Sequence, residues 1–360
     1  MMKKLYCRTT EGKSTHILKS EGIMKIGITF DLRTWYLDHG YSMEETAEFD
    51  KEETIVAIES SLQRMGFETE RIGNIFELTR RLADGCSWNL VFNIAEGLYG
   101  DGRESVVPAL LDQYRIPYVF SGPAVMSLSL NKHLARVAVE SAGVPVSPGR
   151  LIGNRDEIDD TGLSYPLFVK PVSEGTGKGI TNMSKVNDPF RFKEQVEKII
   201  TQYNQPALVE EYLPGREFTV GITGSGKETR VLGGMEVICH DNMPYSVEVK
   251  ENYQSFVKYA PIPDDLVDEC YDVAVRAWNA LMAVDGGRVD LRADRHGRVC
   301  FIEANPLAGL NPLHSDLPIL AHMNGIDYHD LLKRIVDAAL ERHGLGNEKK
   351  VLHTLQQSGC

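Results

Sequence analysis

The stretch RVDLRADRHGRVCFIEAN, residues 288–305, governs the interpretation of the whole sequence. Two apolar segments flank a turn at 294–297, a pattern that predicts a β-hairpin. Asp290 lies on the first predicted strand. Glu303 and Asn305 are two residues apart on the second, so their side chains face the same way. Two carboxylates and an amide oxygen form the hard-oxygen donor set that magnesium prefers, and magnesium commonly bridges nucleotide phosphates. The hairpin therefore predicts a magnesium site.

Arg288 precedes Asp290 by two residues and shares its face of the strand. A guanidinium in this position can stabilise negative charge on a reacting phosphoryl or tetrahedral oxygen. The alternative is an exposed hairpin whose charged residues face water. Because apolar residues flank the whole set, we favour the metal site, with Arg288 as a catalytic residue.

A glycine-rich loop follows the predicted buried strand that carries Lys170 in FVKPVSEGTGKGI, residues 168–180. Glycines allow backbone N–H groups to approach phosphate oxygens closely. The loop does not fit the G-x-G-x-x-G pattern at a strand-to-helix turn, so a dinucleotide-binding fold is not supported. An ordinary glycine-rich hairpin is the alternative. The candidate nucleotide-binding residues of this loop are Glu174, Gly175, Thr176, Gly177, Lys178 and Gly179.

Three other polar residues are candidates for nucleotide contacts. Lys132 starts a predicted helix in SLNKHLA, where it either meets phosphate or is solvated. In ALVEEYLPGREFTV, Glu210 lies near the end of one predicted strand and Glu217 opens the next. Their carboxylates can accept hydrogen bonds from an adenine amine or ribose hydroxyls, unless they lie on an exposed edge. GITGSGKE nearly matches a P-loop, but it ends in Glu228 and is typical of a hairpin turn.

The composition of the 360-residue chain is that of a soluble globular protein with two or three domains. A net charge of −12 argues against a nonspecific nucleic-acid binder, which needs a basic surface. The six cysteines lack C-x-x-C spacing, so neither a zinc site nor a disulfide framework is predicted, and a reducing cytoplasm fits best. No apolar run approaches the roughly 20 residues that span a bilayer. We expect small-molecule substrates, with no membrane and no nucleic-acid partner.

Periodicity predicts an α/β unit followed by an α+β unit. Strands and helices alternate in the first, which indicates a parallel sheet, and its helix at 50–66 is expected to be capped by Asp50 and to end at Gly66. Later strands are joined largely by turns, which indicates an antiparallel sheet with a few helices. Residues 1–23 are either a disordered extension or residues upstream of a true start at Met24. The other predicted segments are an N-terminal α/β domain at 24–122, a central lid unit at 123–206, a C-terminal unit at 207–346 and a flexible tail at 347–360.

Six ordered blocks together resemble the D-alanine–D-alanine ligase family of the ATP-grasp superfamily. The blocks are VFNIAEG, SLNK, VKPVSEGTGKGI, EEYLPGREFTV, YSVEVKENY and GRVDLRADRHGRVCFIEANPLAGLNP. The resemblance implies an ATP-grasp fold in which ATP lies between a central lid and a C-terminal antiparallel-sheet domain. It also implies a reaction in which a carboxylate takes the γ-phosphate of ATP and an amine attacks the acyl-phosphate, with release of ADP and phosphate. Relatives in this family are commonly dimers through the N-terminal domain.

The resemblance further implies roles for individual residues, carried over by position. The 174–179 loop would close over the ATP phosphates. By position, the other ATP ligands are Lys132, Lys170, Glu210, Tyr212, Leu213 and Glu217. The ligands of two magnesium ions, which manganese can replace, are Asp290, Glu303 and Asn305. Arg288 is the residue that stabilises charge during acyl transfer.

The departures from the family concern the amino-acid pocket. In the family, a Glu in a Glu-Arg-Glu-Val-Ser-like segment holds the ammonium of the first substrate, whereas here DLRTWYLDHGYSMEETAEFDKEE follows the first strand. The His of the family's F-N-x-x-H-G block is replaced by Glu96. A Tyr that follows the loop lysine in the family is replaced by Glu251, which follows Lys250. We hypothesise that Glu96 binds a substrate ammonium and Lys250 binds the carboxylate of the second substrate, both as catalytic and substrate-binding residues. The other predicted substrate contacts are Gly309 and Ser315, with His314 as an alternative.

We therefore predict an ATP-dependent carboxylate–amine ligase that joins two small substrates, amino acids in our interpretation. One alternative is a genuine D-alanine–D-alanine ligase of cell-wall synthesis. A second is a noncatalytic nucleotide-binding relative, against which the full set of phosphate and metal candidates argues. A purine-type ATP-grasp carboxylase is a third, and the lid and loop blocks match the D-alanine group better. The sequence leaves the substrates and their stereochemistry open.

Overall fold

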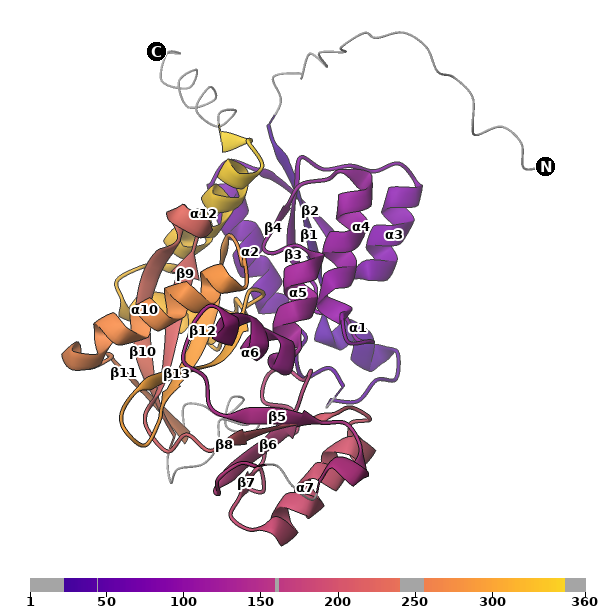
Figure 1. Cartoon of the computed structure of the whole chain (residues 1–360). Coiled ribbons are helices and arrows are strands. Elements are labelled where there is room, and N and C mark those ends of the chain that lie inside the picture. The colour runs from indigo at the N-terminus through magenta and orange to yellow at the C-terminus, as the bar shows by residue number, and fades with distance from the viewer. Residues whose placement is uncertain (1–22, 44, 159–161, 240–255, 347–360) are drawn as a thin grey trace, which may run out of the picture.

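The structure is a computed structural model that describes residues 23–43, 45–158, 162–239 and 256–346. Its strands form three sheets, each with helices packed against it (Figure 1). No helix within these ranges is long and apolar enough to cross a membrane. The predictions for residues 1–22, for the tail from residue 347 and for Lys250 concern residues outside the described ranges.

The first sheet is parallel and has the order β2-β1-β3-β4. Its strands are β1 (Lys25–Phe30), β2 (Glu68–Gly73), β3 (Leu90–Ile94) and β4 (Tyr118–Val119). Helix α2 (Glu52–Arg64) covers one face, whereas α3 (Ile75–Ala83) and α4 (Val106–Tyr114) cover the other. All five residues of β3 are buried, as expected for a central strand of a sheet with helices on both faces.

The second sheet is antiparallel and has the order β11-β10-β9-β12-β13. The strands are β9 (Glu217–Thr223), β10 (Arg230–Cys239), β11 (Val257–Ala260), β12 (Gly286–Ala293) and β13 (Val299–Asn305). Helices α10 (Asp264–Ala280) and α6 (Lys132–Ser141) pack on one face of this sheet, to which β9 contributes Phe218 and β12 contributes Val289. Because side chains alternate along a strand, Thr219 and Asp290 point to the opposite face.

The third sheet is also antiparallel, with the order β5-β8-β6-β7. It consists of β5 (Gly149–Ile152), β6 (Leu167–Pro171), β7 (Lys185–Val186) and β8 (Ala207–Glu211), and α7 (Pro189–Gln202) packs on one face. The side chain of Asp188 caps α7 by accepting from the backbone N–H groups of Phe190 and Arg191. This sheet and α7 lie below the second sheet in Figure 1.

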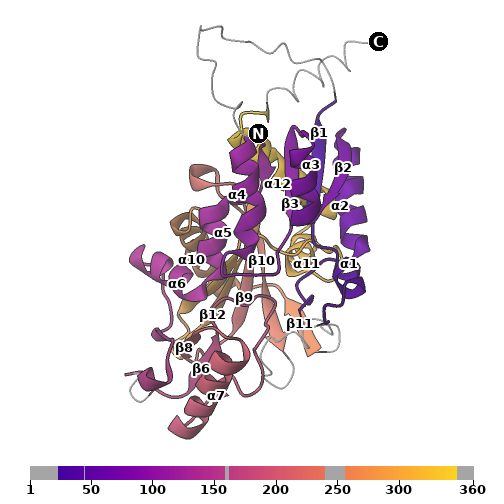
Figure 2. The same cartoon turned by 90° about the vertical axis from the view of Figure 1, so that its right-hand side faces the viewer.

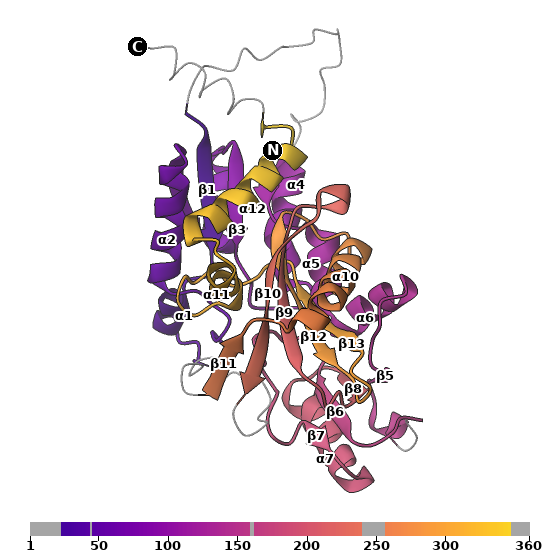
Figure 3. The same ribbon diagram turned by 90° about the vertical axis from the view of Figure 1, so that its left-hand side faces the viewer.

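Two C-terminal helices join the first and second sheets into one core. Helix α11 (Asp316–Met323) packs on β9 and β10, and α12 (Tyr328–Arg342) packs on α2, as Figures 2 and 3 show from two sides. At the end of α12, Arg342 Nε donates to Asp285 Oδ1 at 2.9 Å. The shorter elements are α1 (Arg33–Asp38), α5 (Pro123–Leu130) and the 3-10 turns η1 (Arg103–Ser105), η2 (Arg155–Glu157) and η3 (Gly226–Glu228).

The predicted α/β plus α+β class is confirmed, with two corrections, which concern the number of antiparallel sheets and the cap of α2. The antiparallel strands form two sheets instead of one. The boundary at residue 206 would separate β8 from its sheet, and α6 packs on the second sheet. We therefore place the lid sheet at 149–211, while the division into domains stays a prediction. Asp50 does not cap α2, whose N-cap is Lys51, because the backbone of Asp50 bonds to Asp31.

Candidate active site

The β12–β13 hairpin brings the predicted metal-binding residues together. Asp290 is the register partner of Glu303, and Arg288 is the partner of Asn305. Asn305 Nδ2 lies 3.3 Å from Asp290 Oδ2 and 3.4 Å from Glu303 Oε1. Within the described ranges no cluster of three or more His, Cys, Asp or Glu residues could hold a metal. The donor set here is two carboxylates and an amide, which fits a hard divalent cation that keeps several waters.

A β-bulge in β13 determines where Glu303 points. The register passes from Asp290 opposite Glu303 to Leu291 opposite Phe301, so Ile302 has no partner across the hairpin. A bulge interrupts the strict alternation of side chains. As a result, the adjacent residues Ile302 and Glu303 line the same pocket. Nothing in the sequence signalled this extra residue.

Two pockets adjoin at this hairpin. The inter-sheet pocket lies between the lid sheet and the second sheet. The N-terminal pocket is lined by residues 47–51, the loops after β3 and β13, and part of the lid loop. Lys132 and Glu303 line both pockets. Lys132 is the first residue of α6, and its Nζ lies 3.2 Å from Glu303 Oε2 and donates to the backbone oxygen of Glu174 at 2.5 Å.

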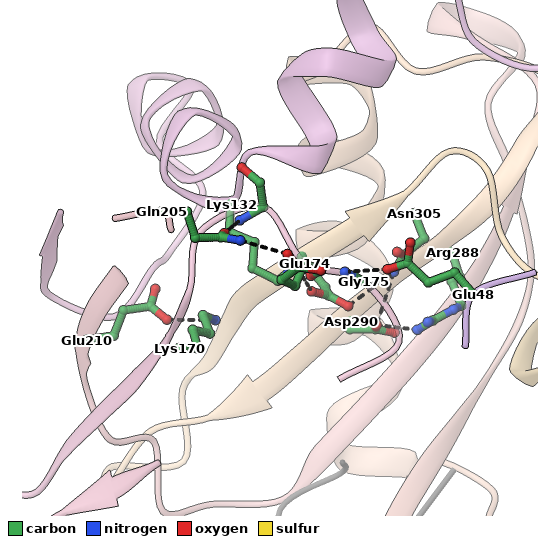
Figure 4. A network of polar contacts seen from close by, with 12 residues as sticks. Glu48, Lys132, Lys170, Glu174, Gly175, Gln205, Glu210, Arg288, Asp290 and Asn305 are labelled. Atoms are coloured by element: carbon green, nitrogen blue, oxygen red, sulfur yellow. Dashed lines mark hydrogen bonds and ion pairs between the residues drawn. The ribbon is translucent and has the colours of Figure 1, made fainter. Parts of the chain in front are cut away.

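The inter-sheet pocket combines an apolar slot with a buried ion pair. Phe168 and Tyr212 stack with ring centroids 6.3 Å apart. Lys170 Nζ lies 2.8 Å from Glu210 Oε2, and both side chains are buried. In Figure 4 this pair lies apart from Asp290 and Arg288, with Lys132 and Glu174 between them. Of the candidate ATP ligands, those that line this pocket are Lys132, Lys170, Glu174, Gly177, Lys178, Glu210, Tyr212, Leu213 and Glu217.

Arg292 is a member of this pocket that the sequence interpretation missed. Its Nη1 donates to Glu217 Oε2 at 3.0 Å, and its Nη2 donates to the hydroxyl of Tyr212 at 3.0 Å. It is two residues beyond Asp290 and therefore on the same face of β12. The spacing of two residues between Asp290 and Arg292 is visible in the sequence and could have predicted this position.

The glycine-rich loop divides its residues between the two pockets. Glu174 accepts from Gln205 Nε2 at 2.7 Å and pairs with Lys178 at 3.3 Å, so its carboxylate shapes the loop. Gly175 and Thr176 line the N-terminal pocket instead of the inter-sheet pocket. Gly179 lines neither pocket and packs against Pro171, where an added Cβ would clash with the Cγ atom of the proline ring. Gly179 is therefore required for packing.

Glu48 connects the lid loop to the N-terminal α/β unit. Its Oε1 accepts from the backbone N–H of Gly175 at 2.8 Å, and its Oε2 lies 3.1 Å from Nη2 of Arg103. Arg103 Nη1 also donates to the backbone oxygen of Ser173 at 2.9 Å. The sequence interpretation missed Glu48 because it treated the segment after the first strand as unlike the family's. The structure nevertheless brings a carboxylate from this segment to the pocket.

The N-terminal pocket holds more carboxylates than the sequence predicted. Glu48, Asp50, Glu96 and Glu104 all line it. Burial raises the pKa of Asp50 to about 7. Burial likewise raises the pKa of Glu104 to about 7, although Arg103 opposes the shift. Burial and the neighbouring Glu104 carboxylate raise the pKa of Glu96 well above its usual range.

The remaining predicted substrate contacts also lie at the N-terminal pocket. Gly309, His314 and Ser315 line it, together with Arg288 and Asn305. Arg288 is paired with Asp290, and its Nη2 lies 3.8 Å from Asp316 Oδ2. Burial lowers the pKa of the guanidinium, but these two carboxylates outweigh that effect and raise the pKa. Arg288 is therefore a fixed cation facing the pocket.

Comparisons with known proteins agree with this geometry. Residues 140–337 match the family model described as D-ala D-ala ligase C-terminus. The chain belongs to the D-alanine–D-alanine ligase family. It is accordingly an ATP-grasp ligase that joins a carboxylate to an amine through a peptide-type bond, and the predicted fold and reaction class are confirmed.

Individual relatives extend the match beyond the C-terminal part. The chain is 32% identical over 259 residues to the uncharacterized protein y4sG of Sinorhizobium fredii, covering 71% of this chain and 75% of that protein. It is 25% identical to the D-alanine–D-alanine ligase of Acetivibrio thermocellus, covering 92% of this chain and 91% of that protein. The solved D-alanine–D-alanine ligase of Bacillus anthracis complexed with ATP superposes with a TM-score of 0.68 at 21% identity, covering 88% and 98% of the two chains.

Proposed function

We propose that this ligase activates the carboxyl group of an amino acid with ATP and joins it to the amine of a second small molecule. The carboxylate oxygen bonds to the γ-phosphorus of ATP as the bond to ADP breaks. The amine then bonds to the acyl carbon, the phosphate leaves, and the amine loses a proton. The observation that supports this most is the junction of the two pockets at Lys132 and Glu303. A nucleotide in one pocket and a carboxylate in the other would meet there.

The inter-sheet pocket is suited to ATP. Its apolar slot at Phe168 and Tyr212 offers a flat surface for the base, and Glu210 and Lys170 offer a hydrogen-bond acceptor and a donor beside it. Glu217 would accept from the ribose hydroxyls. The phosphates would then extend toward Lys132, whose ammonium can neutralise part of their charge. The loop at 174–179 would cover them and exclude water.

Asp290, Glu303 and Asn305 would hold two magnesium ions, which we infer from their donor chemistry and mutual distances. Bound magnesium would neutralise phosphate charge. Arg288 would stabilise the negative charge that develops on the acyl oxygen, because Asp290 and Asp316 fix its guanidinium at the edge of the N-terminal pocket. Such fixed donors need no reorganisation during the reaction.

The N-terminal pocket would bind the amino acid. Glu96 would accept from its ammonium, with Glu48 nearby to hold the lid loop closed through Gly175. Gly309 and Ser315 would contact the second substrate, and Lys250 remains proposed as the residue that binds its carboxylate. A location in the cytoplasm and a homodimer remain proposals as well.

D-alanine as both substrates is the second candidate, because relatives covering most of the chain are named D-alanine–D-alanine ligases. The four carboxylates of the N-terminal pocket, those of Glu48, Asp50, Glu96 and Glu104, argue against this candidate, because a single small ammonium needs few acceptors.

The experiment measures phosphate release from ATP and magnesium across single and paired D- and L-amino acids, with products identified by mass. A product equal in mass to two substrates minus water, formed with ADP and phosphate, is the expected result. Turnover with D-alanine alone would favour the second candidate. ATP binding without any product would contradict the proposal and return the noncatalytic alternative.

A further inference from the structure

Glu96 and Glu104 present two carboxylates without partners to the N-terminal pocket. Glu96 follows β3, and Glu104 lies in η1. Within the described residues no hydrogen bond or ion pair joins either side-chain carboxylate to another group, and both line the pocket. Their mutual repulsion is one reason why the pKa of Glu96 is raised. A cation between them would relieve that repulsion.

Three of the cations that line or adjoin the pocket, Arg103, Lys132 and Arg288, already have anionic or carbonyl partners. Arg103 is paired with Glu48 at 3.1 Å and donates to the backbone oxygen of Ser173. Lys132 is paired with Glu303 at 3.2 Å and donates to the backbone oxygen of Glu174. Arg288 is paired with Asp290 of β12 and lies 3.8 Å from Asp316 of α11. Arg103 offsets part of the charge of both carboxylates, and Lys132 offsets part of that of Glu104, but within the described residues neither cation bonds to them.

Ser129 gives an independent indication of a ligand at the same wall. It lies on α5, which packs against the turn that carries Glu104, and it lines the N-terminal pocket. The side chain is only 6% exposed, and its Oγ has no hydrogen-bond partner within the described part of the chain. Buried hydroxyls are normally hydrogen-bonded, so an unpartnered one at a pocket wall indicates a missing ligand group. An ammonium can donate up to three hydrogen bonds, enough for this hydroxyl and a carboxylate.

We propose that the amino acid bound in the N-terminal pocket is a diamino acid, whose α-ammonium binds Glu96 and whose side-chain ammonium binds Glu104 and Ser129. The inference rests on the proposed function, which supplies the assignment of this pocket to an amino acid. Two ammonium groups balance the two carboxylates. A neutral side chain of the same length would leave the Glu104 carboxylate and the Ser129 hydroxyl covered and unpaired, and a site built for a polar group discriminates strongly against an analogue that lacks it.

The test compares each diamino acid with the neutral amino acid in which a methyl group replaces the terminal ammonium. The pairs are 2,3-diaminopropionate with 2-aminobutyrate, 2,4-diaminobutyrate with norvaline, ornithine with norleucine and lysine with 2-aminoheptanoate, each as D and L forms. With the full chain, ATP and magnesium, we expect at least one diamino acid to exceed its neutral counterpart by about a hundredfold in kcat/KM for phosphate release. Equal or higher kcat/KM for every neutral counterpart would overturn the inference.

Titration calorimetry with the same pairs, in the presence of a nonhydrolysable ATP analogue, separates this inference from the proposed function. Turnover of neutral amino acids without a diamino preference would overturn the inference and leave the ligase intact. Absence of product with every compound would contradict the proposed function. The calorimetric preference would then still decide whether the pocket selects a second ammonium.

Three substitutions locate the second ammonium. Glu104→Gln and Ser129→Ala are expected to reduce the preference for the diamino acid over its neutral counterpart, by about tenfold or more for Glu104→Gln. Glu53→Gln removes an exposed carboxylate from α2, outside the pocket, and is the matched control for charge. An unchanged preference in Glu104→Gln, with a folded protein by circular dichroism, would show that the second ammonium does not bind there and would overturn the proposal.

Discussion

Lys132 Nζ lies 3.2 Å from Glu303 Oε2, and these two side chains line both the inter-sheet pocket and the N-terminal pocket. They come from different parts of the fold, α6 and β13, which pack against each other. The pair therefore fixes the boundary at which a nucleotide phosphate and a substrate carboxylate would meet. It also keeps a cation and a candidate metal ligand in contact before either substrate binds.

Replacing Glu303 with glutamine is expected to weaken metal use. The change keeps the shape of the side chain but removes an anionic oxygen from the candidate magnesium site. We expect the magnesium concentration for half-maximal phosphate release to rise by about tenfold or more. The measurement is a magnesium titration at saturating ATP, with Glu228→Gln, an exposed change in η3, as the control. An unchanged magnesium requirement would contradict the assignment of Glu303.

The buried pair of Lys170 and Glu210 predicts a coupled effect on stability and nucleotide binding. Glu210→Gln leaves the ammonium of Lys170 without its partner at 2.8 Å, and removal of one member of a buried pair typically costs about 3 kcal/mol. We expect a lower free energy of unfolding and a KM for ATP raised by more than about tenfold.

A second substitution separates the two effects of Glu210→Gln. The double variant Lys170→Met with Glu210→Gln removes both charges, so it should recover part of the stability without recovering ATP binding. Urea unfolding and ATP kinetics on the two variants provide the measurement. Full recovery of the KM for ATP in the double variant would show that the pair serves packing alone.

Gly175→Ala is expected to break the contact between the lid loop and Glu48. A Cβ at this position would lie 2.5 Å from Glu48 Oε1, so one of the two groups must move. Because Glu48 also lines the N-terminal pocket, the KM for the amino acid should rise more than the KM for ATP. The control is Gly153→Ala, where the nearest atom that an added Cβ would meet is 4.0 Å away. Equal changes in both KM values would point to general loosening of the lid.

Much of the hairpin site was predictable, because the sequence there obeys a local rule. The turn at 294–297 sets the pairing of the strands, and a period of two places Arg288 with Asp290 and Glu303 with Asn305. The same rule gave Arg292, which we overlooked. The bulge at Ile302 was not predictable, since it reflects packing across the sheet.

The opposite wall of the site depends on contacts distant in sequence. Glu48 lies 127 residues from Gly175, and no periodicity in the segment after β1 indicates that its carboxylate reaches the lid loop. Ser129 and Glu104 similarly come together only because α5 packs on η1. The number of carboxylates in the N-terminal pocket therefore emerged from the fold and not from the motifs.

Asp50→Asn is expected to stabilise the protein at alkaline pH. Burial raises the pKa of Asp50 to about 7 in the folded protein, whereas its usual value is about 3.8. The folded state thus favours the protonated form, and the corresponding stability is fully present below about pH 4 and is lost as the pH rises through 7. An uncharged asparagine avoids this loss, so the variant should gain on the order of 4 kcal/mol over the wild type at pH 8 and little at pH 4. Urea unfolding from pH 4 to 8 measures the difference, with Glu53→Gln on the exposed face of α2 as the control that should show no such trend. A difference independent of pH would mean that the Asp50 carboxyl keeps its ordinary pKa, and a variant less stable at pH 8 would mean that its charge is compensated in the folded protein.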